Sequence, residues 1–304
     1  MGKKLNLYIL GLILIFGCGE EIPSIKPATE DKPVTVQKIE TPVFNQDSAY
    51  QFIQTQVDFG PRVPNSEAHK KCGTWLENTL TKYGAKTIVQ EAVVTAFNGD
   101  KLNMKNIIAQ FSPEKTNRVM LFAHWDTRPW ADNDSENKNK PILGADDGAS
   151  GCAVMLEIAR AIEQSEIELE DIGVDFLFVD VEDVGKTEWS ELSFSLGTQY
   201  WAQTPHKPAY KANYGICLDM VGAKNAQFLL EGFSKRYADD KQRNIWDIAN
   251  KLGYSQYFLY QDGGAITDDH VVVNEMAKIP CVDIININES GSENEDKLMK
   301  KELS

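Results

Sequence analysis

The hydrophobic positions of this chain change their spacing many times between about residue 45 and residue 285. In some segments they recur every three to four residues, which is typical of amphipathic helices, and in others they form short runs typical of strands. The first pattern predicts helices over residues 48–57, 66–83, 150–163, 197–203 and 237–252. The second predicts strands over residues 88–94, 104–111, 118–123, 172–179, 214–218, 227–232 and 279–285. This alternation predicts a three-layer α/β fold, with a mostly parallel twisted central sheet and helices on both faces.

The beginning of the chain follows neither pattern. After a short basic start, an apolar run extends from Leu5 to Phe16, which is too short to span a bilayer and is typical of a signal peptide. Gly17 then directly precedes Cys18, an arrangement that resembles the bacterial lipobox, in which the Cys is lipidated. We therefore predict a lipoprotein signal peptide over residues 1–17, with Cys18 as the lipidated N-terminus. An ordinary signal followed by a chance Cys is the alternative.

Residues 18–44 are rich in Glu, Pro, Lys and Thr and show almost no apolar periodicity. This composition is typical of a flexible tether. The remaining residues, 45–304, have a length that fits one α/β domain. The sequence thus predicts an exported protein that is lipid-anchored to a bacterial membrane, on its periplasmic or cell-surface side.

Acidic residues outnumber basic ones, and the formal net charge is −14. This charge argues against nucleic acid as a partner, because the phosphates would be repelled. It favours solubility, and it is also suited to attract a cationic group such as the amine of a peptide.

The five cysteines show no CxxC spacing, which argues against a zinc finger or a redox motif. Cys152, Cys217 and Cys281 each lie within apolar helix or strand patterns. We therefore expect buried free thiols there rather than disulfides, although an exported protein could form either.

Acidic and histidine side chains follow three of the predicted buried strands. They are His124 and Asp126 after the strand at 118–123, Glu182 and Asp183 after the strand at 172–179, and Asp219 after the strand at 214–218. A further acid, Asp147, lies in a Gly-flanked turn before the helix at 150–163. Because ligands of open α/β sheets bind beyond the carboxyl ends of the strands, these side chains are candidates for one common site.

The residue types in this set suit a metal site. His124 or Asp126 could bind an ion while the other orients its partner, and Asp147 could bridge two ions. Glu182 and Asp183 are adjacent and point apart, so one could bind metal while the other acts as a general base. Each motif alone also has an ordinary structural interpretation, as a turn, a solvated strand end or a hydrogen-bonded histidine. Their combination at strand ends favours the metal site.

Five segments stand out together: Ala123–Trp130, Gly144–Gly151, Asp180–Asp183, Leu218–Ala223 and Thr267–His270. In combination they resemble the zinc aminopeptidase superfamily, and within it the glutaminyl cyclases (glutaminyl-peptide cyclotransferases), especially bacterial ones. The resemblance extends over nearly the whole domain, from about Val57 to Ile285. The last two segments favour a cyclase over an aminopeptidase.

The resemblance implies roles for the acidic residues. Asp147 and Asp183 would bind the catalytic zinc, and Glu182 would carry protons as base and acid. Asp219 and Asp268 would line the site in a hydrogen-bonded network of carboxylates with Glu182.

The resemblance also implies roles around these acids. His124 would belong to the second metal position of two-zinc aminopeptidases, together with Asp147 and Asp219. His270 would lie beside the substrate pocket. Trp125, Trp130 and Trp189 are candidates for walls of that pocket, and ordinary packing is the alternative for each.

The function implied is zinc-dependent conversion of an N-terminal Gln to pyroglutamate with release of ammonia. One zinc ion and a monomeric chain are expected, with peptides or proteins that begin with Gln as substrates and a lipid anchor in the membrane. One alternative is an aminopeptidase of the same fold with two zinc ions. Another is a peptide-binding lipoprotein without catalysis.

The chain departs from the family after the last predicted strand. The family takes its final zinc ligand from a His in that region, usually in a Trp-His-Thr segment, whereas no His or Trp follows His270 here. We therefore expect a domain that is truncated or divergent after about residue 286, with an impaired catalytic zinc site. A truncated gene product, a degenerate homologue and a site rebuilt around His124 are the explanations considered, and the first is favoured.

Overall fold

The computed structural model describes residues 41–132, 134–165, 169 and 171–286. The described residues from Thr41 onward belong to one compact unit. The predicted signal peptide, the lipidated Cys18, most of the tether and the divergent segment after residue 286 lie outside the described residues. None of the helices in the described part of the chain has the length and hydropathy needed to span a bilayer.

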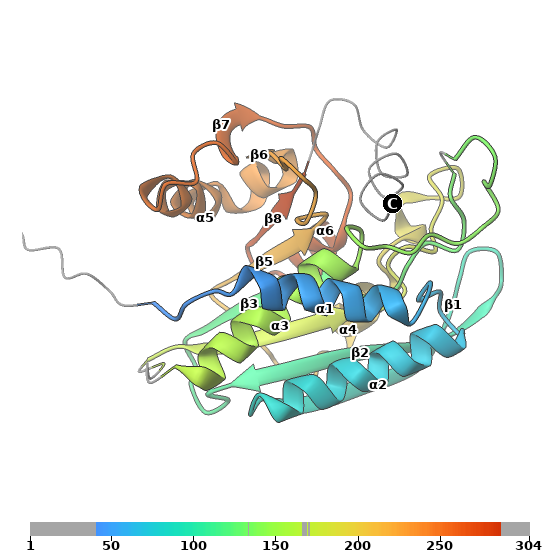
Figure 1. Cartoon of the computed structure of the whole chain (residues 1–304), viewed down its shortest axis with the longest axis horizontal. Helices are drawn as coiled ribbons and strands as arrows, with labels where there is room; N and C mark the ends of the chain where they lie inside the picture. Colours follow the sequence, from blue (N-terminus) through green and yellow to red (C-terminus); the bar gives the residue numbers. More distant parts are fainter. Residues whose placement is uncertain (1–40, 133, 166–168, 170, 287–304) are drawn as a thin grey trace, which may run out of the picture. The chain divides into compact units, whose positions relative to one another are not determined.

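The core of the fold is a six-stranded sheet with the order β1-β2-β4-β3-β5-β8 (Figure 1). Its strands are β1 (Lys86–Thr95), β2 (Lys101–Phe111), β3 (Arg118–His124), β4 (Gly173–Val179), β5 (Tyr214–Asp219) and β8 (Cys281–Ile285). Strands β4, β3, β5 and β8 run parallel to one another. Strand β2 is antiparallel to both β4 and β1. The α/β fold with a mostly parallel sheet is therefore confirmed, with an antiparallel hairpin added at one edge.

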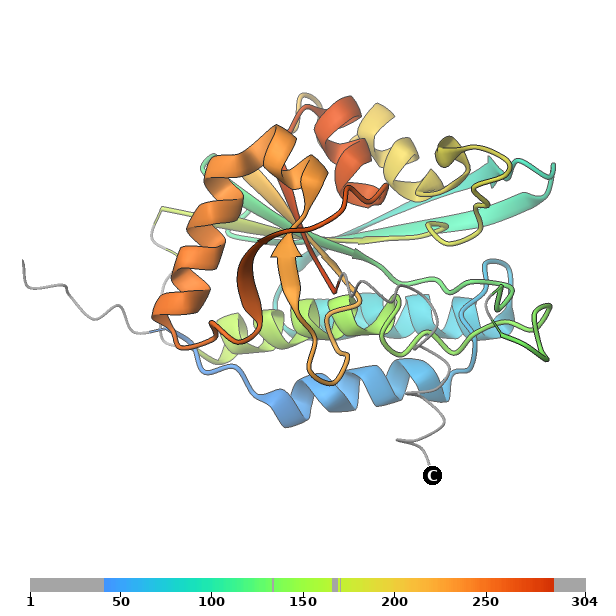
Figure 2. The same ribbon diagram turned by 90° about the horizontal axis from the view of Figure 1, so that it is seen from above.

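The helices cover both faces of this sheet (Figure 2). They are α1 (Gln46–Asp58), α2 (Glu67–Lys82), α3 (Ala149–Gln164), α4 (Leu196–Gln203), α5 (Gly232–Lys251) and α6 (Asp269–Val272), with short turns η1 (Glu191–Ser193) and η2 (Val273–Ala277). Helices α1, α2 and α3 lie on one face, whereas α4, α6 and η2 lie on the other. Helix α5 packs against β8 and β7 at the far edge.

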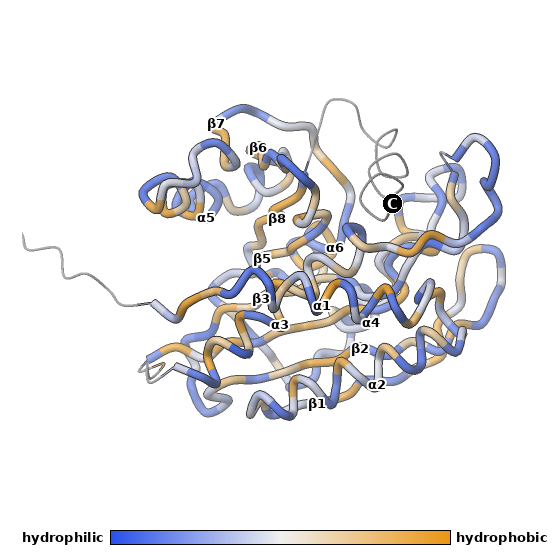
Figure 3. The backbone as a smooth tube through the Cα atoms, viewed as in Figure 1, coloured by the Kyte–Doolittle hydropathy of each residue, from blue (hydrophilic) through white to orange (hydrophobic). Residues whose placement is uncertain are grey.

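Strand β4 shows why the continuous apolar runs predicted buried strands correctly. Successive side chains of a strand point to opposite faces of a sheet. Phe176 and Phe178 accordingly belong to one hydrophobic cluster, and Leu177 and Val179 belong to another on the opposite face. Figure 3 shows hydrophobic residues along the central strands, while the loop between β3 and α3 is largely hydrophilic.

Local sequence also sets the helix boundaries. Ser66 caps α2, because its hydroxyl oxygen accepts a hydrogen bond from the amide of His69 at 3.0 Å. Helix α5 begins five residues before the predicted start at Tyr237, because Glu231 accepts hydrogen bonds from the amides of Phe233 and Ser234. Ala238, with a φ of −148°, then interrupts the helical geometry and obscures the pattern.

One strand was missed by the sequence pattern. Strand β7 (Phe258–Asp262) is largely exposed and pairs with β6 (Phe228–Leu230) in a separate two-stranded sheet. Its apolar residues Phe258, Leu259 and Tyr260 are followed directly by Gln261 and Asp262, so the run is too short to predict a strand by itself.

The predicted buried free thiols of Cys152, Cys217 and Cys281 are confirmed, and Cys72 is likewise buried and forms no disulfide.

The packing of α3 on β5 depends on a residue without a side chain. A Cβ atom at Gly151 would lie 2.1 Å from the carbonyl oxygen of Leu218 and 2.8 Å from Cβ of Ala123. We expect Gly151→Ala to lower the free energy of unfolding by about 3 kcal/mol through overpacking. Denaturant unfolding would measure this change. Gly264→Ala, where a Cβ would meet nothing within 4 Å, is the matched control, and an equal effect of the two variants would contradict the prediction.

Candidate active site

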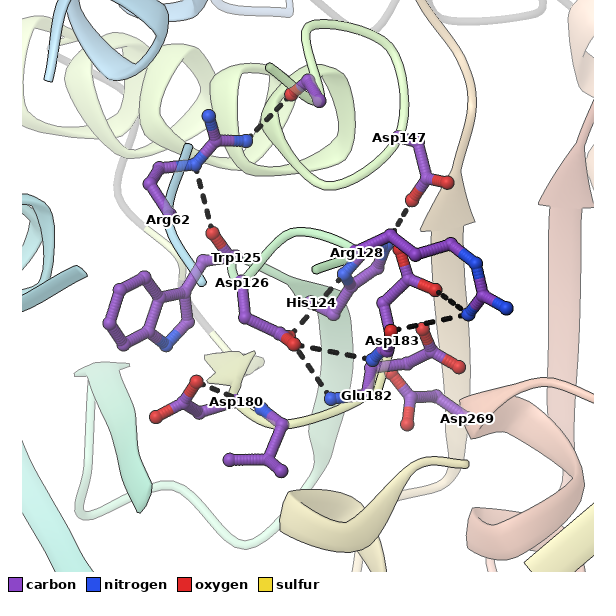
Figure 4. Close-up of polar contacts among 12 residues, drawn as sticks. Arg62, His124, Trp125, Asp126, Arg128, Asp147, Asp180, Glu182, Asp183 and Asp269 are labelled. Carbon is purple, nitrogen blue, oxygen red and sulfur yellow. Dashed lines mark hydrogen bonds and ion pairs between the residues drawn. The ribbon is translucent and has the colours of Figure 1, made fainter. Parts of the chain in front are cut away.

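The carboxyl ends of β3, β4 and β5 bring the predicted acids together with His124 (Figure 4). Nε2 of His124 lies 2.9 Å from Oδ1 of Asp147 and 3.4 Å from Oδ1 of Asp219. Single ligand atoms of these three side chains all lie within 4.8 Å of one another. His124 itself is only 3% exposed. The predicted triplet of His124, Asp147 and Asp219 is thus gathered in one place.

The loop that carries Asp147 is held by a buried arginine. Arg62 donates from Nε to the carbonyl of Trp125 at 3.1 Å, and from its two Nη atoms to the carbonyls of Leu143 and Gly144 at 2.6 Å each. The guanidinium thereby ties the end of β3 to the loop before α3 (Figure 4). No role was predicted for Arg62.

Gly148, directly after Asp147, has a φ of +91°, which favours glycine. A Cβ atom there would lie 2.7 Å from the carbonyl oxygen of Asp126 and 3.2 Å from Cε1 of His124. The glycine therefore allows the loop to approach His124 closely.

Asp126 joins the end of β3 to the end of β4. Its Oδ1 accepts a hydrogen bond from the amide of Glu182 at 3.0 Å, and its Oδ2 accepts one from the amide of Asp183 at 3.2 Å. Oδ1 also lies 3.6 Å from Nδ1 of His124. Asp126 therefore fixes the backbone that presents the two adjacent acids, and its predicted role in orienting His124 stays a prediction.

Asp183 faces a cation of the chain itself. Its Oδ1 accepts a hydrogen bond from Nη1 of Arg128 at 2.9 Å, whereas its Oδ2 is buried and has no hydrogen-bond partner. The guanidinium of Arg128 also lies 5.4 Å from the ring centroid of Trp130. Arg128 was not predicted as a site residue, because an arginine within a loop gives no signal of its partner.

The electrostatics of the site follow from burial among like charges. Burial, together with the negative charges of Asp183, Asp269 and Asp268, raises the pKa of Glu182 well above its ordinary value. Burial and the charge of Asp147 do the same to the pKa of Asp183, although Arg128 opposes them. Glu182 therefore binds a proton more strongly than an ordinary glutamate does.

The neighbouring carboxylates favour the charged form of His124, whereas they disfavour the charged form of Glu182 and Asp183. Burial by itself lowers the pKa of His124, but the nearby carboxylates of Asp126, Asp147 and Asp219 raise the pKa of the imidazole well above its ordinary value. A positive charge is thus stabilised at the centre of the triplet. A bound metal ion would place its own charge at the same point and displace that proton.

Asp269, for which no role was predicted, lies near the site together with Asp268, whose charge also acts on Glu182 and Asp219. Asp268 caps α6 and accepts a hydrogen bond from Sγ of Cys217 at 3.4 Å. Within the described residues, no hydrogen bond joins its side chain to Glu182 or Asp219. Asp269 is the fully buried acid beside Glu182 and Asp183 (Figure 4), and burial raises its pKa to about 8. The doubled Asp was a visible signal, but the sequence did not show that both acids lie near Glu182.

Two of the predicted pocket residues lie elsewhere. Trp125 is in the hydrophobic core, stacked on the ring of His69 at a centroid distance of 4.3 Å, so its predicted role as a pocket wall is wrong. Successive residues at the strand end point apart, so Trp125 faces the core when His124 faces the acids. His270 is fully buried, with Nε2 3.1 Å from Oε2 of Glu231, and it does not line an open pocket either.

Trp130 and Trp189 pack against each other edge to face, with ring centroids 6.1 Å apart. Nζ of Lys186 lies 4.4 Å from the ring centroid of Trp130. Arg128 contacts both Trp130 and Asp183, so it connects this pair of rings to the site. Their role as pocket walls stays a prediction.

The site residues fit a divalent metal ion. His124, Asp147 and Asp219 offer one nitrogen and two oxygen donors, and three protein ligands with one open position are typical of a catalytic zinc. The unpartnered Oδ2 of Asp183 is a further oxygen donor, and Asp183 feels the charge of Asp147. The cluster also buries more negative charge than His124 and Arg128 can balance, which favours a bound cation.

Comparisons with known proteins bear on this site. The model of Peptidase family M28 matches residues 106–300. The crystal structure of Porphyromonas gingivalis glutaminyl cyclase is 48% identical, with a TM-score of 0.79, over 83% of this chain and 88% of that chain. A Zn-dependent exopeptidase from Parabacteroides distasonis is 47% identical, with a TM-score of 0.80, over 84% of this chain and 92% of that chain.

A curated relative is more distant. The glutaminyl-peptide cyclotransferase-like protein of Bos taurus is 24% identical over 231 residues, which are 69% of this chain. The chain spans 59% of the length of that relative.

The buried acids predict how the metal-free protein responds to pH. Burial raises the pKa of Asp219 to about 7 and that of Asp269 to about 8, from an ordinary 3.8. Between the ordinary pKa of 3.8 and the raised values, the folded state binds more protons than the unfolded state. The free energy of unfolding therefore falls as the pH rises through this interval. We expect a higher melting temperature at pH about 6 than at pH about 8.5 in the presence of a chelator.

The matched variant is Asp269→Asn, which should reduce this dependence because it removes one of the two groups. Added zinc should reduce it as well, since an ion competes with the protons. A melting temperature of the metal-free protein that rises over the same interval would contradict the assignment.

Proposed function

The chain belongs to Peptidase family M28, and within this family we propose that it is a zinc-dependent glutaminyl-peptide cyclotransferase. The observation that carries the proposal is the position of Glu182, a buried acid with a raised pKa beside the triplet of His124, Asp147 and Asp219. The 48% identity with the glutaminyl cyclase of Porphyromonas gingivalis supports a cyclase within the family.

Glu182 is the proton carrier in this proposal. It takes a proton from the α-amine of an N-terminal Gln while the amine nitrogen forms a bond to the side-chain amide carbon. It then gives the proton to the amide nitrogen as the bond from that carbon breaks, and ammonia leaves. A raised pKa suits a group that must both accept and donate a proton near neutral pH.

The other residues of the site would hold the metal ion and attract the substrate. His124, Asp147 and Asp219 would hold the zinc ion, which when bound supplies a Lewis acid for a carbonyl oxygen. The acids Asp183 and Asp269 place negative charge around Glu182, which favours the approach of a cationic amine.

The triplet of His124, Asp147 and Asp219 is the metal position in this proposal. The predicted loss of the C-terminal ligand concerns residues outside the described part and stays a prediction. Among the described residues, the triplet around His124 is a complete donor set, whereas Asp183 pairs with Arg128. We therefore place the ion at the triplet, which corresponds to a site rebuilt around His124.

A second candidate function is a zinc aminopeptidase of the same fold. The similarity to the exopeptidase from Parabacteroides distasonis favours it, as does the triplet that corresponds to the second metal position of such enzymes. In that case Glu182 would act as base for a water molecule that attacks a peptide bond.

The proposal includes the setting of the enzyme. Its substrates would be peptides or proteins that begin with Gln, and the chain would act as a monomer on a membrane to which Cys18 anchors it. The apolar run that ends at Gly17-Cys18 supports export and lipidation.

Removing the proton carrier should abolish turnover without removing the ion. We expect Glu182→Gln to fold and to bind zinc, but to form pyroglutamate from a Gln-peptide about 10²- to 10⁴-fold more slowly. Asp147→Ala should lose metal as well as activity, because it removes a ligand. Coupled ammonia release and metal content per chain measure the two effects. Equal activity of Glu182→Gln and the wild-type protein would refute the role of this residue.

Metal content tests the proposed position of the ion. We expect about one zinc per wild-type chain and much less in His124→Ala, because the triplet then loses its nitrogen donor. His206→Ala, which removes a histidine far from the triplet, should keep the ion. Release of Leu from Leu-peptides, together with two ions per chain, would favour the aminopeptidase instead.

A further inference from the structure

The backbone just before Glu182 is strained. Val181 has a φ of +57°, in the left-handed region that β-branched residues rarely adopt. Such a conformation persists only where the surrounding structure enforces it. The side chain of Val181 is fully buried, in a cluster with Ala96, Leu102 and Val184. The direction of Glu182 therefore depends on whatever holds this turn.

Four consecutive amide groups of the turn donate to side-chain oxygens. The amide of Asp180 donates to Oδ1 of Asn106 at 3.0 Å, and that of Val181 donates to Oδ1 of Asp180 at 2.8 Å. The amides of Glu182 and Asp183 donate to Asp126, as described above. Side chains, rather than a strand or helix ladder, thus determine the path of the backbone here.

Asp180 is the acid at the centre of this arrangement. Besides the amide of Val181, its carboxylate accepts a hydrogen bond from the amide of Lys105 in β2 at 2.7 Å. It is fully buried, and its side chain makes no contact with the triplet around His124. Its geometry assigns it to the support of the turn rather than to the metal.

His69 is the third hydrogen-bond partner of this carboxylate. Nε2 of His69 lies 2.8 Å from Oδ1 and 3.0 Å from Oδ2 of Asp180. The ring is 3% exposed and stacks on Trp125 at an interplanar angle of 16°. His69 lies in the first turn of α2, whose start is fixed by the cap at Ser66. The histidine thereby connects α2 to the end of β4.

We propose that His69 and Asp180 are positioning residues for Glu182. The histidine orients the carboxylate of Asp180, and this carboxylate holds Val181 in its left-handed conformation, so that Glu182 projects toward the metal triplet. This inference rests on the proposed function where it treats Glu182 as the proton carrier. In this role both residues act through the backbone of the turn and not as metal ligands.

The chain supplies a matched control at the opposite end of β4. His206 also stacks on a tryptophan, Trp201, at an interplanar angle of 20°, and its Nδ1 accepts a hydrogen bond from Nε1 of that ring at 3.1 Å. Its ring centroid also lies 4.6 Å from that of Tyr210, and its Nε2 contacts Gln110, which donates to Asp175 near the start of the strand. His206 is less buried than His69, but it shares the stacking on a tryptophan and lies away from the turn before Glu182.

The experiment compares His69→Ala, His69→Gln and His206→Ala in the full chain with zinc bound. We expect His69→Ala to lower kcat for a Gln-peptide about 100-fold, as for a misplaced catalytic group, with little change in KM or zinc content. His69→Gln retains an N–H donor for Asp180 and should lose less. His206→Ala should lower the melting temperature without changing kcat.

A second readout does not depend on turnover. Amide hydrogen exchange of residues 180–183 and of Lys105 should accelerate in His69→Ala but not in His206→Ala. If the wild-type protein has no cyclase activity, the proposed function fails, and the exchange measurement alone decides the positioning role. Unchanged exchange in His69→Ala, or a kcat equal to that of His206→Ala, would overturn the inference.

Discussion

Burial of negative charge at the carboxyl ends of the parallel strands is the constraint on which the rest of this structure depends. Removing a carboxylate from water costs several kcal/mol unless a proton, a cation or hydrogen-bond donors compensate it. Glu182, Asp183 and Asp269 are all nearly inaccessible, and they lie close enough to raise one another's pKa. Three kinds of contact compensate this cost. Arg128 forms an ion pair with Asp183, and His124 lies within ion-pair distance of Asp147 and Asp219. Backbone amides donate hydrogen bonds to the carboxylate of Asp126.

These compensating contacts come from elements that are distant in the sequence. Arg62 precedes α2, Arg128 follows β3, and Asp180 reaches an amide of β2 in the antiparallel hairpin. The hairpin at the edge of the sheet is therefore part of the support of the site and not only an extension of the core. A change in the register of β2 against β4 would move the amide of Lys105 away from Asp180 and loosen the turn before Glu182.

The sequence predicted the sheet, five of the helices and the cluster of His124 with the strand-end acids, because each rests on a local pattern. A strand that is buried on both faces must be apolar throughout, and the acids directly follow such strands. Other features depend on three-dimensional pairing and leave no local trace. Trp125 was predicted as a candidate pocket residue, but the alternation of side chains at the strand end directs it toward His69. Arg128 and Asp269 gained their roles only from partners more than fifty residues away.

The buried guanidinium of Arg62 has a consequence for how an ion arrives. Arginine keeps its charge at any physiological pH, even though burial lowers its pKa here, so its three bonds to backbone carbonyls persist whether or not a ligand is present. The segment that carries Asp147 is therefore already in place before an ion binds. Little conformational entropy remains to be lost on association, and more of the intrinsic coordination energy is retained as affinity.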